Sequence, residues 1–172
     1  NYIDKIANSK VYEVANISPL TKADNLSKEL ANSIFLKRED LQPTHSFKIR
    51  GAYNKIAHLY RSKKISEVVT ASAGNHAQGV AYSAKELGIK ATIFMPKTTP
   101  LIKVNAVRDL KAKVVLVGNN FDDALKESKA FCKKNKVNFI HPFDDPLVIA
   151  GQGTVGMEIS EQFPKNLYAV FV

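Results

Sequence analysis

Short apolar runs alternate with longer segments of helical periodicity along most of this chain, and this alternation restricts the fold more than any other feature. The expected strands, four to six residues long, cover Ile34–Lys37, Glu67–Ser72, Ala91–Met95, Lys113–Val117 and Asn138–His141. The expected helices cover Phe47–Leu59, Asn75–Leu87, Pro100–Leu110, Phe121–Lys134 and Pro146–Phe163. Strands that alternate with helices form βαβ units, because parallel neighbours need a crossover connection. The sequence therefore predicts an α/β fold with three layers, αβα, around a parallel twisted sheet.

The two ends of the chain add less regular elements. Tyr2–Lys10 has the spacing of a short amphipathic helix, and Leu26–Ala31 can form one or two further helical turns. The final run, Leu167–Val172, is continuously apolar and is predicted to be a buried strand. A buried strand normally leads into another element, so we expect this chain to be the amino-terminal part of a longer protein.

The composition is that of an ordinary globular protein with an excess of positive charge. Of the 172 residues, 45% are hydrophobic and 24% are charged, and the formal net charge is +9. The lysines are spread over expected helix faces, so solvated surfaces explain the charge better than a nucleic-acid site does. No apolar run reaches membrane-spanning length and the first residues lack the regions of a signal peptide, so we expect a cytoplasmic protein without membrane partners. A single cysteine, Cys132, excludes an intrachain disulfide.

Lys48 stands at the start of an expected helix, directly after Phe47. The dipole of a helix disfavours a cation in its first turn, and burial beside an aromatic ring acts in the same direction. Both effects favour the neutral amine, which is the form that condenses with an aldehyde. In a basic chain the ordinary alternative is a solvated lysine. We select Lys48 as the candidate nucleophile.

A second motif, Thr70–Val80 (TASAGNHAQGV), joins an expected strand to an expected helix through small residues. The free amides at the start of that helix form a site for a carboxylate, and the small side chains let a ligand approach the backbone. A plain helix cap by Ser72 or Asn75 is the alternative. We expect Thr44–Lys48 and Ala71–His76 both to lie at carboxyl ends of strands and to open on one edge of the sheet, where such sheets bind ligands.

Three glycines in Ile149–Glu158 (IAGQGTVGME) match the spacing GxGxxG. A dinucleotide site requires a strand before this spacing, whereas Pro146–Ala150 is predicted to be the first part of a helix. Glycines weaken an isolated helix, so they indicate close packing of the backbone here.

The remaining titratable residues have structural explanations. No metal site is predicted, because no usual zinc spacing relates His45, His76 and His141. The neighbouring carboxylates Glu39 and Asp40 could serve acid–base chemistry, but ion pairs with Arg38 or Arg50 explain them more simply.

The segment Lys37–Ala52 (KREDLQPTHSFKIRGA) resembles the cofactor-lysine motif of threonine dehydratases, which belong to the fold type II pyridoxal-phosphate enzymes and have a tryptophan synthase β-like fold. The resemblance is nearly gap-free and extends over essentially the whole chain. It implies that pyridoxal 5'-phosphate binds through Lys48 beside Phe47, and that Asn75 contacts the phenolic oxygen of the cofactor. The loop implied to hold the substrate carboxylate consists of Ser72, Ala73, Gly74, Asn75 and His76.

The resemblance also implies a reaction, in which L-threonine is dehydrated and deaminated to 2-oxobutanoate and ammonia, with serine as a second substrate. Lys48 would act as the base that removes the α-proton. Ala73 stands where serine racemases of this fold carry an acid–base serine, which argues against racemisation. Residues 38–43 and His45 resemble the biosynthetic branch of the isoleucine pathway, which implies a homotetramer with a regulatory C-terminal domain.

The family's domain division places residues 1–40 in a larger subdomain, 41–145 in a small αβα subdomain, and 146–172 again in the larger one, before a glycine-rich loop that holds the cofactor phosphate. Without that loop we expect weak cofactor binding and negligible dehydratase activity from the isolated chain. The alternatives are another fold type II enzyme such as serine racemase, a non-enzymatic phosphate- or nucleotide-binding α/β module, and a nucleic-acid-binding protein whose affinity would fall steeply with salt.

Overall fold

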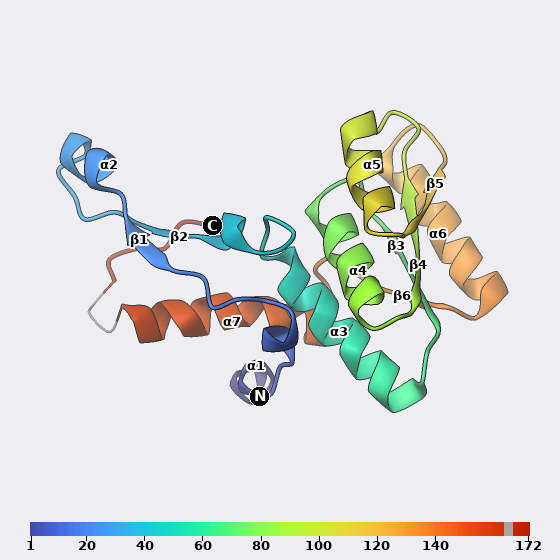
Figure 1. The fold of residues 1–172 in the computed structure, drawn as a ribbon, viewed down its shortest axis with the longest axis horizontal. Helices are drawn as coiled ribbons and strands as arrows, with labels where there is room; N and C mark the ends of the chain where they lie inside the picture. The colour runs from blue at the N-terminus through green and yellow to red at the C-terminus, as the bar shows by residue number, and fades with distance from the viewer. Residues whose placement is uncertain (164–166) are drawn as a thin grey trace.

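The structure, a computed structural model, describes residues 1–163 and 167–172, and its central feature is a four-stranded sheet (Figure 1). The strands lie in the order β5-β4-β3-β6, and every neighbouring pair is parallel. They are β3 (Glu67–Ala71), β4 (Lys90–Met95), β5 (Lys113–Leu116) and β6 (Asn138–Phe139). The predicted parallel sheet is confirmed for these four strands.

Helices cover both faces of this sheet. One face packs against α3 (Lys48–Lys63), α4 (Asn75–Glu86) and α5 (Leu101–Asp109), and the other packs against α6 (Phe121–Asn135). Successive side chains of a strand point to opposite faces, so Val68 joins the core under α4 whereas Val69 joins the core against α6. The three-layer αβα arrangement is therefore confirmed.

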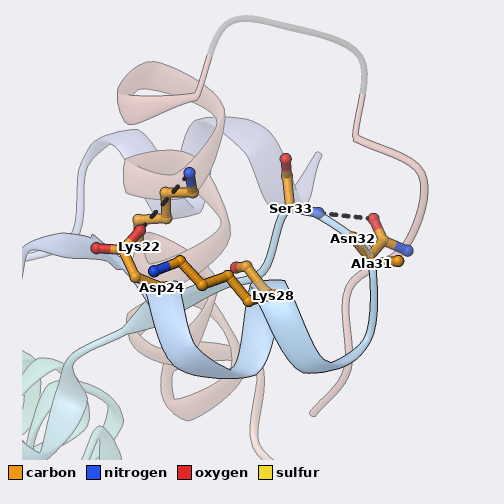
Figure 2. A pocket seen from close by; sticks show the side chains of 7 residues that line it. Lys22, Asp24, Lys28, Ala31, Asn32 and Ser33 are labelled. Carbon is orange, nitrogen blue, oxygen red and sulfur yellow. Dashed lines mark hydrogen bonds and ion pairs between the residues drawn. The ribbon is translucent and has the colours of Figure 1, made fainter.

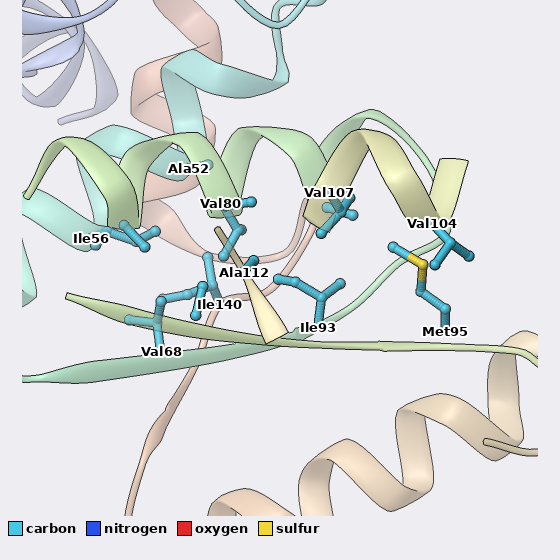
Figure 3. Close-up of a cluster of buried hydrophobic side chains, with 14 of the residues drawn as sticks. Ala52, Ile56, Val68, Val80, Ile93, Met95, Val104, Val107, Ala112 and Ile140 are labelled. Carbon is cyan, nitrogen blue, oxygen red and sulfur yellow. The ribbon is translucent and has the colours of Figure 1, made fainter. Parts of the chain in front are cut away.

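The larger core lies between the sheet and helices α4 and α5, where buried side chains from both layers interdigitate (Figure 3). On the opposite face a smaller core forms around the rings of Phe94 and Phe131, whose centroids lie 5.5 Å apart. Burial of this kind removes apolar surface from water and is the main source of stability. The strands β3 and β6 are consequently held by packing on both faces of the sheet.

The other elements lie on the far side of α3 from the sheet (Figure 1). There α1 (Tyr2–Ala7) packs against α7 (Pro146–Gln162), which also packs along α3. The strands β1 (Leu20–Lys22) and β2 (Phe35–Lys37) pair antiparallel, with α2 (Asp24–Glu29) between them. Short 3-10 turns occupy Val11–Glu13 and Glu39–Leu41.

Two expectations about strands are wrong. The strand that ends at Lys37 does not belong to the parallel sheet, because it pairs with β1, which the sequence pattern did not reveal. The apolar run Leu167–Val172 forms no strand in the described part of the chain, and the side chains of Tyr168 and Phe171 are exposed. A strand requires a neighbour with free backbone groups, and the C-terminus lies apart from the four-stranded sheet (Figure 1).

Within the described residues, no helix combines the length and the apolar character that crossing a membrane requires.

Candidate active site

Lys48 is the first residue of α3, as the sequence predicted. Its backbone N–H donates to the hydroxyl of Ser46 at 3.2 Å. Its amine, Nζ, lies 5.0 Å from the centroid of the Phe47 ring and donates to the carbonyl oxygen of Pro142 at 3.3 Å. The half-buried amine is thus held between an aromatic ring and the segment that follows β6.

The two motifs meet through helix packing, which corrects the expectation that both follow strands of one sheet. Ala71–His76 does follow β3, but the strand before Lys48 lies outside the parallel sheet. A Cβ atom at Gly79 of α4 would lie 3.0 Å from the carbonyl oxygen of Lys48, so the two helices approach at this point with almost no space between them. Close packing of α3 on α4 therefore brings the lysine to the end of β3.

The loop between β3 and α4 leaves the start of α4 uncapped. The residue before the helix is Gly74, and no side chain makes a capping hydrogen bond, so the alternative of a cap by Ser72 or Asn75 is wrong. The hydroxyl of Ser72 instead accepts from the N–H of Gly74 at 3.2 Å. The amide of Ala77 donates to the carbonyl of Gly74 at 3.0 Å, whereas those of Asn75 and His76 have no acceptor in the described part of the chain, and Asn75 is exposed. This end of α4 can accept an anion such as a carboxylate.

His76 is the buried member of this loop, with only 3% of its surface exposed. Its Nε2 lies 3.1 Å from the carbonyl oxygen of Ile140, so this nitrogen carries the hydrogen. The other nitrogen, Nδ1, is buried and has no hydrogen-bond partner in the described structure. Burial, with a smaller contribution from the charge of Lys48, lowers the pKa of His76 to about 4. His76 is therefore neutral and ties the loop to the end of β6, which agrees with the orienting role expected of it.

The segment after β6, which we define as residues 140–147, is held by α3 and α4 at several points. Besides Lys48 and His76, Lys55 forms an ion pair with Asp145 at 2.7 Å, and the side chain of Asn54 donates to the carbonyl of Leu147 at 2.8 Å. Lys55 and the amides of α7 together lower the pKa of Asp145, although burial acts in the opposite direction. The 140–147 segment is thus a fixed wall beside the candidate nucleophile. The sequence analysis did not identify it.

A buried ion-pair network lies next to the lysine along α3. The fully buried guanidinium of Arg50 contacts both Glu39 and Glu158, and Lys37 donates to Glu158 at 2.6 Å. Burial raises the pKa of Glu158, but hydrogen bonds from Arg50 and Lys37 outweigh it and hold the pKa below its usual value. Two cations facing two carboxylates leave the network electrically balanced.

The predicted ion-pair explanation is confirmed for both carboxylates, since Asp40 pairs with Arg38 at 2.7 Å and Glu39 pairs with Arg50. Neither carboxylate is left free for acid–base chemistry.

The glycine-rich segment lies inside α7, which rules out the dinucleotide motif and confirms close packing. A Cβ atom at Gly151 would lie 2.7 Å from the carbonyl oxygen of Arg50 and 2.7 Å from the Cα of Gly51. A Cβ atom at Gly153 would meet the side chain of Ile6 at 2.6 Å. Gln152 accepts from the N–H of Gly51 at 3.2 Å. These residues join helices to one another.

Two surface cavities lie outside both motifs. One, of about 480 Å³, is bounded by α2 and contains the exposed pair Lys22 and Asp24, 3.6 Å apart (Figure 2). The other, of about 420 Å³, lies between α1, α3 and the start of α7. Among the described residues, no three His, Cys, Asp or Glu side chains are grouped so that they could hold a metal ion.

Residues 13–172 match the family model described as pyridoxal-phosphate dependent enzyme. The chain belongs to this family. The family's cofactor is pyridoxal phosphate, and its fold is the fold type II architecture found here. The amine of Lys48, half-buried and accessible between Phe47 and the 140–147 segment, fits a cofactor that is held through an aldehyde.

Several proteins of similar sequence are threonine dehydratases. The chain is 52% identical over 161 residues to the biosynthetic L-threonine dehydratase of Pasteurella multocida, covering 94% of this chain and 31% of that protein. It is 53% identical over 171 residues to the chloroplastic biosynthetic threonine dehydratase 1 of Solanum lycopersicum, covering 99% of this chain and 28% of that protein. The chain therefore spans about a third of the length of these curated relatives.

Solved structures show the same similarity in three dimensions. The processed form of threonine deaminase isoform 2 from Solanum lycopersicum superimposes with a TM-score of 0.89 and 49% identity, over 94% of this chain and 45% of that one. Maize serine racemase also gives a TM-score of 0.89, with 32% identity, over 95% of this chain and 50% of that one.

Proposed function

We propose that this chain forms the amino-terminal part of a biosynthetic threonine dehydratase, which converts L-threonine to 2-oxobutanoate and ammonia and also accepts serine. The observation that carries the proposal is the position of the Lys48 amine, between the Phe47 ring and the carbonyl of Pro142, beside the uncapped start of α4. The threonine dehydratases of similar sequence support the choice of substrate.

Each motif residue has a role in this proposal. Lys48 holds the cofactor through its amine and, once released, takes the α-proton of the substrate onto Nζ. Asn75 donates its amide to the cofactor, and Phe47 packs beside it. Pyridoxal phosphate, when bound, supplies the electron sink that stabilises the deprotonated substrate. The chain's own contribution is to orient the amine and to fix where the proton goes.

The loop at the start of α4 binds the substrate carboxylate in this proposal. The residues that form it are Ser72, Ala73, Gly74, Asn75 and His76. The amides of Ser72 and Gly74 already donate within the protein, so those of Ala73, Asn75 and His76 are the ones that would bind the carboxylate. The methyl group of Ala73 carries no transferable proton, so this loop provides no second acid–base group for racemisation. Elimination with Lys48 as the single base is the reaction that remains.

We also propose a homotetramer, a place in isoleucine biosynthesis and a cytoplasmic location for the whole protein, together with the division into 1–40, 41–145 and 146–172. The biosynthetic names of the bacterial relatives support the pathway. Other relatives are named as chloroplastic or mitochondrial, so the location depends on the organism.

The proposal is tested with the full-length protein and two lysine variants. Incubation with pyridoxal phosphate, borohydride reduction and peptide mapping should label Lys48. Lys48→Ala should lose the label and reduce threonine-dependent formation of 2-oxobutanoate by at least about 100-fold. Lys63→Ala, at the exposed far end of the same helix, should keep both. Labelling of another lysine, or full activity of Lys48→Ala, would contradict the proposal.

A further inference from the structure

Phe143 is exposed yet fixed in position. Its side chain is 66% exposed, and its ring meets the His141 ring edge-on, with the centroids 4.7 Å apart. His141 Nδ1 also accepts from the backbone N–H of Phe143 at 3.3 Å and from that of Asp144 at 2.7 Å. An isolated exposed apolar side chain is common and needs no explanation. The Phe143 ring has a defined orientation, because His141 contacts both the ring and the backbone of this residue.

The surrounding segment adds to this rigidity. Phe143 lies in the 140–147 segment, between Ile140, which accepts from His76, and Asp145, which pairs with Lys55. Contacts from α3 and α4 on both sides of the residue prevent the segment from swinging away. The phenyl ring is therefore an apolar surface on a segment that is held on both sides.

The residue that carries this ring directly follows a contact of the candidate nucleophile. Lys48 donates to the carbonyl of Pro142 at 3.3 Å, and Phe143 is the next residue. Backbone and side-chain dimensions therefore place the Phe143 ring within about 10 Å of the Lys48 amine. In the proposed reaction, on which this step rests, the substrate amine takes the place of the lysine amine. The β-methyl group of threonine would then be three bonds beyond that nitrogen.

We propose that Phe143 is a specificity-determining residue, whose ring forms an apolar wall for the β-methyl group of threonine. Serine lacks this methyl group and gains nothing from the wall. A methyl group in an apolar pocket changes kcat/KM by about 10-fold or more. Phe143 therefore raises the preference for threonine over serine, a preference that the Lys48 and Asn75 motifs leave open.

The test measures kcat/KM for threonine and for serine with the full-length protein. Phe143→Ala should lower the threonine-to-serine ratio about 10-fold, whereas Phe143→Leu, which keeps an apolar side chain, should keep most of it. Phe121→Ala removes another exposed ring, at the start of α6, and should leave the ratio unchanged. A ratio in Phe143→Ala within twofold of the unmodified protein would overturn the inference.

A second measurement does not depend on turnover. L-2-Aminobutanoate differs from L-alanine by the same methyl group, and neither carries a leaving hydroxyl. Calorimetry should show tighter binding of 2-aminobutanoate to the cofactor-loaded protein, and Phe143→Ala should remove the difference. If Phe143→Ala leaves the difference in affinity between the two ligands unchanged, the role of Phe143 is overturned but the proposed function is not. No turnover of either amino acid and no borohydride label on Lys48 would overturn the proposed function as well.

Discussion

The neutral state of His76 makes the stability of the fold depend on pH. The pKa of this side chain falls to about 4 in the folded protein, mainly through burial, against about 6.5 in an unfolded chain. Above pH 6.5 neither state is protonated and the free energy of unfolding is unaffected. Between pH 6.5 and 4 only the unfolded chain binds the proton, so stability is lost as pH falls, by about 2 kcal/mol between pH 7 and pH 5.

Urea unfolding at pH 7 and pH 5 checks this expectation. His76→Gln should lose less stability on acidification than the unmodified protein, whereas His58→Gln, at an exposed position of α3, should behave like the unmodified protein. An equal loss in all three proteins would show that His76 already titrates normally in the folded state.

Arg50 and Arg38 allow a matched comparison of a buried and an exposed ion pair. Arg50→Met should lower the free energy of unfolding by about 3–5 kcal/mol, because it leaves the carboxylates of Glu39 and Glu158 buried with too little positive charge. Arg38→Met breaks only a solvent-exposed pair with Asp40 and should change stability little. Denaturant midpoints give both values. Similar losses in the two variants would mean that the Arg50 network is not protected from water.

Single residues were predicted well where a motif carried them. The roles of Lys48 and His76 stay predictions, but the position of Lys48 in the first turn of a helix was apparent from local sequence. The partners of these residues were not, because the carbonyls of Ile140 and Pro142 come from segments 64 and 94 positions away. Such contacts depend on how helices pack, which local patterns do not specify.

The crossing of α3 and α7 gives the sharpest prediction about an element. Gly151→Ala would place a Cβ atom 2.7 Å from the backbone of Arg50 and Gly51, and backbone cannot yield as a flexible side chain can. The overlap should lower the free energy of unfolding by about 1–3 kcal/mol.

Gly156, one and a half turns further along α7, is the internal control. No atom lies within 4 Å of a Cβ atom built there, so Gly156→Ala should stabilise the helix by about 0.5–1 kcal/mol. Both variants can be compared by their urea midpoints. Changes of the same sign would indicate that helix propensity, and not the crossing, determines the outcome.

Elements with strong periodicity were predicted to within a few residues, and weak ones were not. The helix expected to end at Leu59 continues to Lys63, because basic residues in its last turn suit the helix dipole and need no apolar partner. The three-residue strand β1 was missed, since it is too short to show an alternating pattern and gains its identity only from pairing with β2.

At the scale of the molecule, protection from hydrogen exchange should follow the layers. The amides of β3 and β4 lie between two helical layers and should exchange most slowly, whereas those of Leu167–Val172, which form no regular structure, should exchange fastest. Hydrogen exchange followed by mass spectrometry of peptides measures both. Slowest exchange in α1 or in β1 would contradict a core centred on the sheet.

The fold class followed from the alternation of strands and helices, but the pairing of the strand that ends at Lys37 did not. The sequence placed the strand that ends at Lys37 in line with the others, whereas the structure pairs it outside the sheet (Figure 1). Period and length identify a strand, but they do not say which strand is its neighbour. The three subdomain ranges came from the family resemblance and stay a prediction.

The network around Arg50 also bears on how long the folded state survives. It joins residues 108, 121 and 146 positions apart, through Arg50, Lys37 and Tyr12 to Glu158. We expect contacts across such long loops to form after the transition state, because the entropy of loop closure opposes them. Interactions that are absent from the transition state slow unfolding without accelerating folding. The network should therefore slow unfolding and lengthen the lifetime of the folded state.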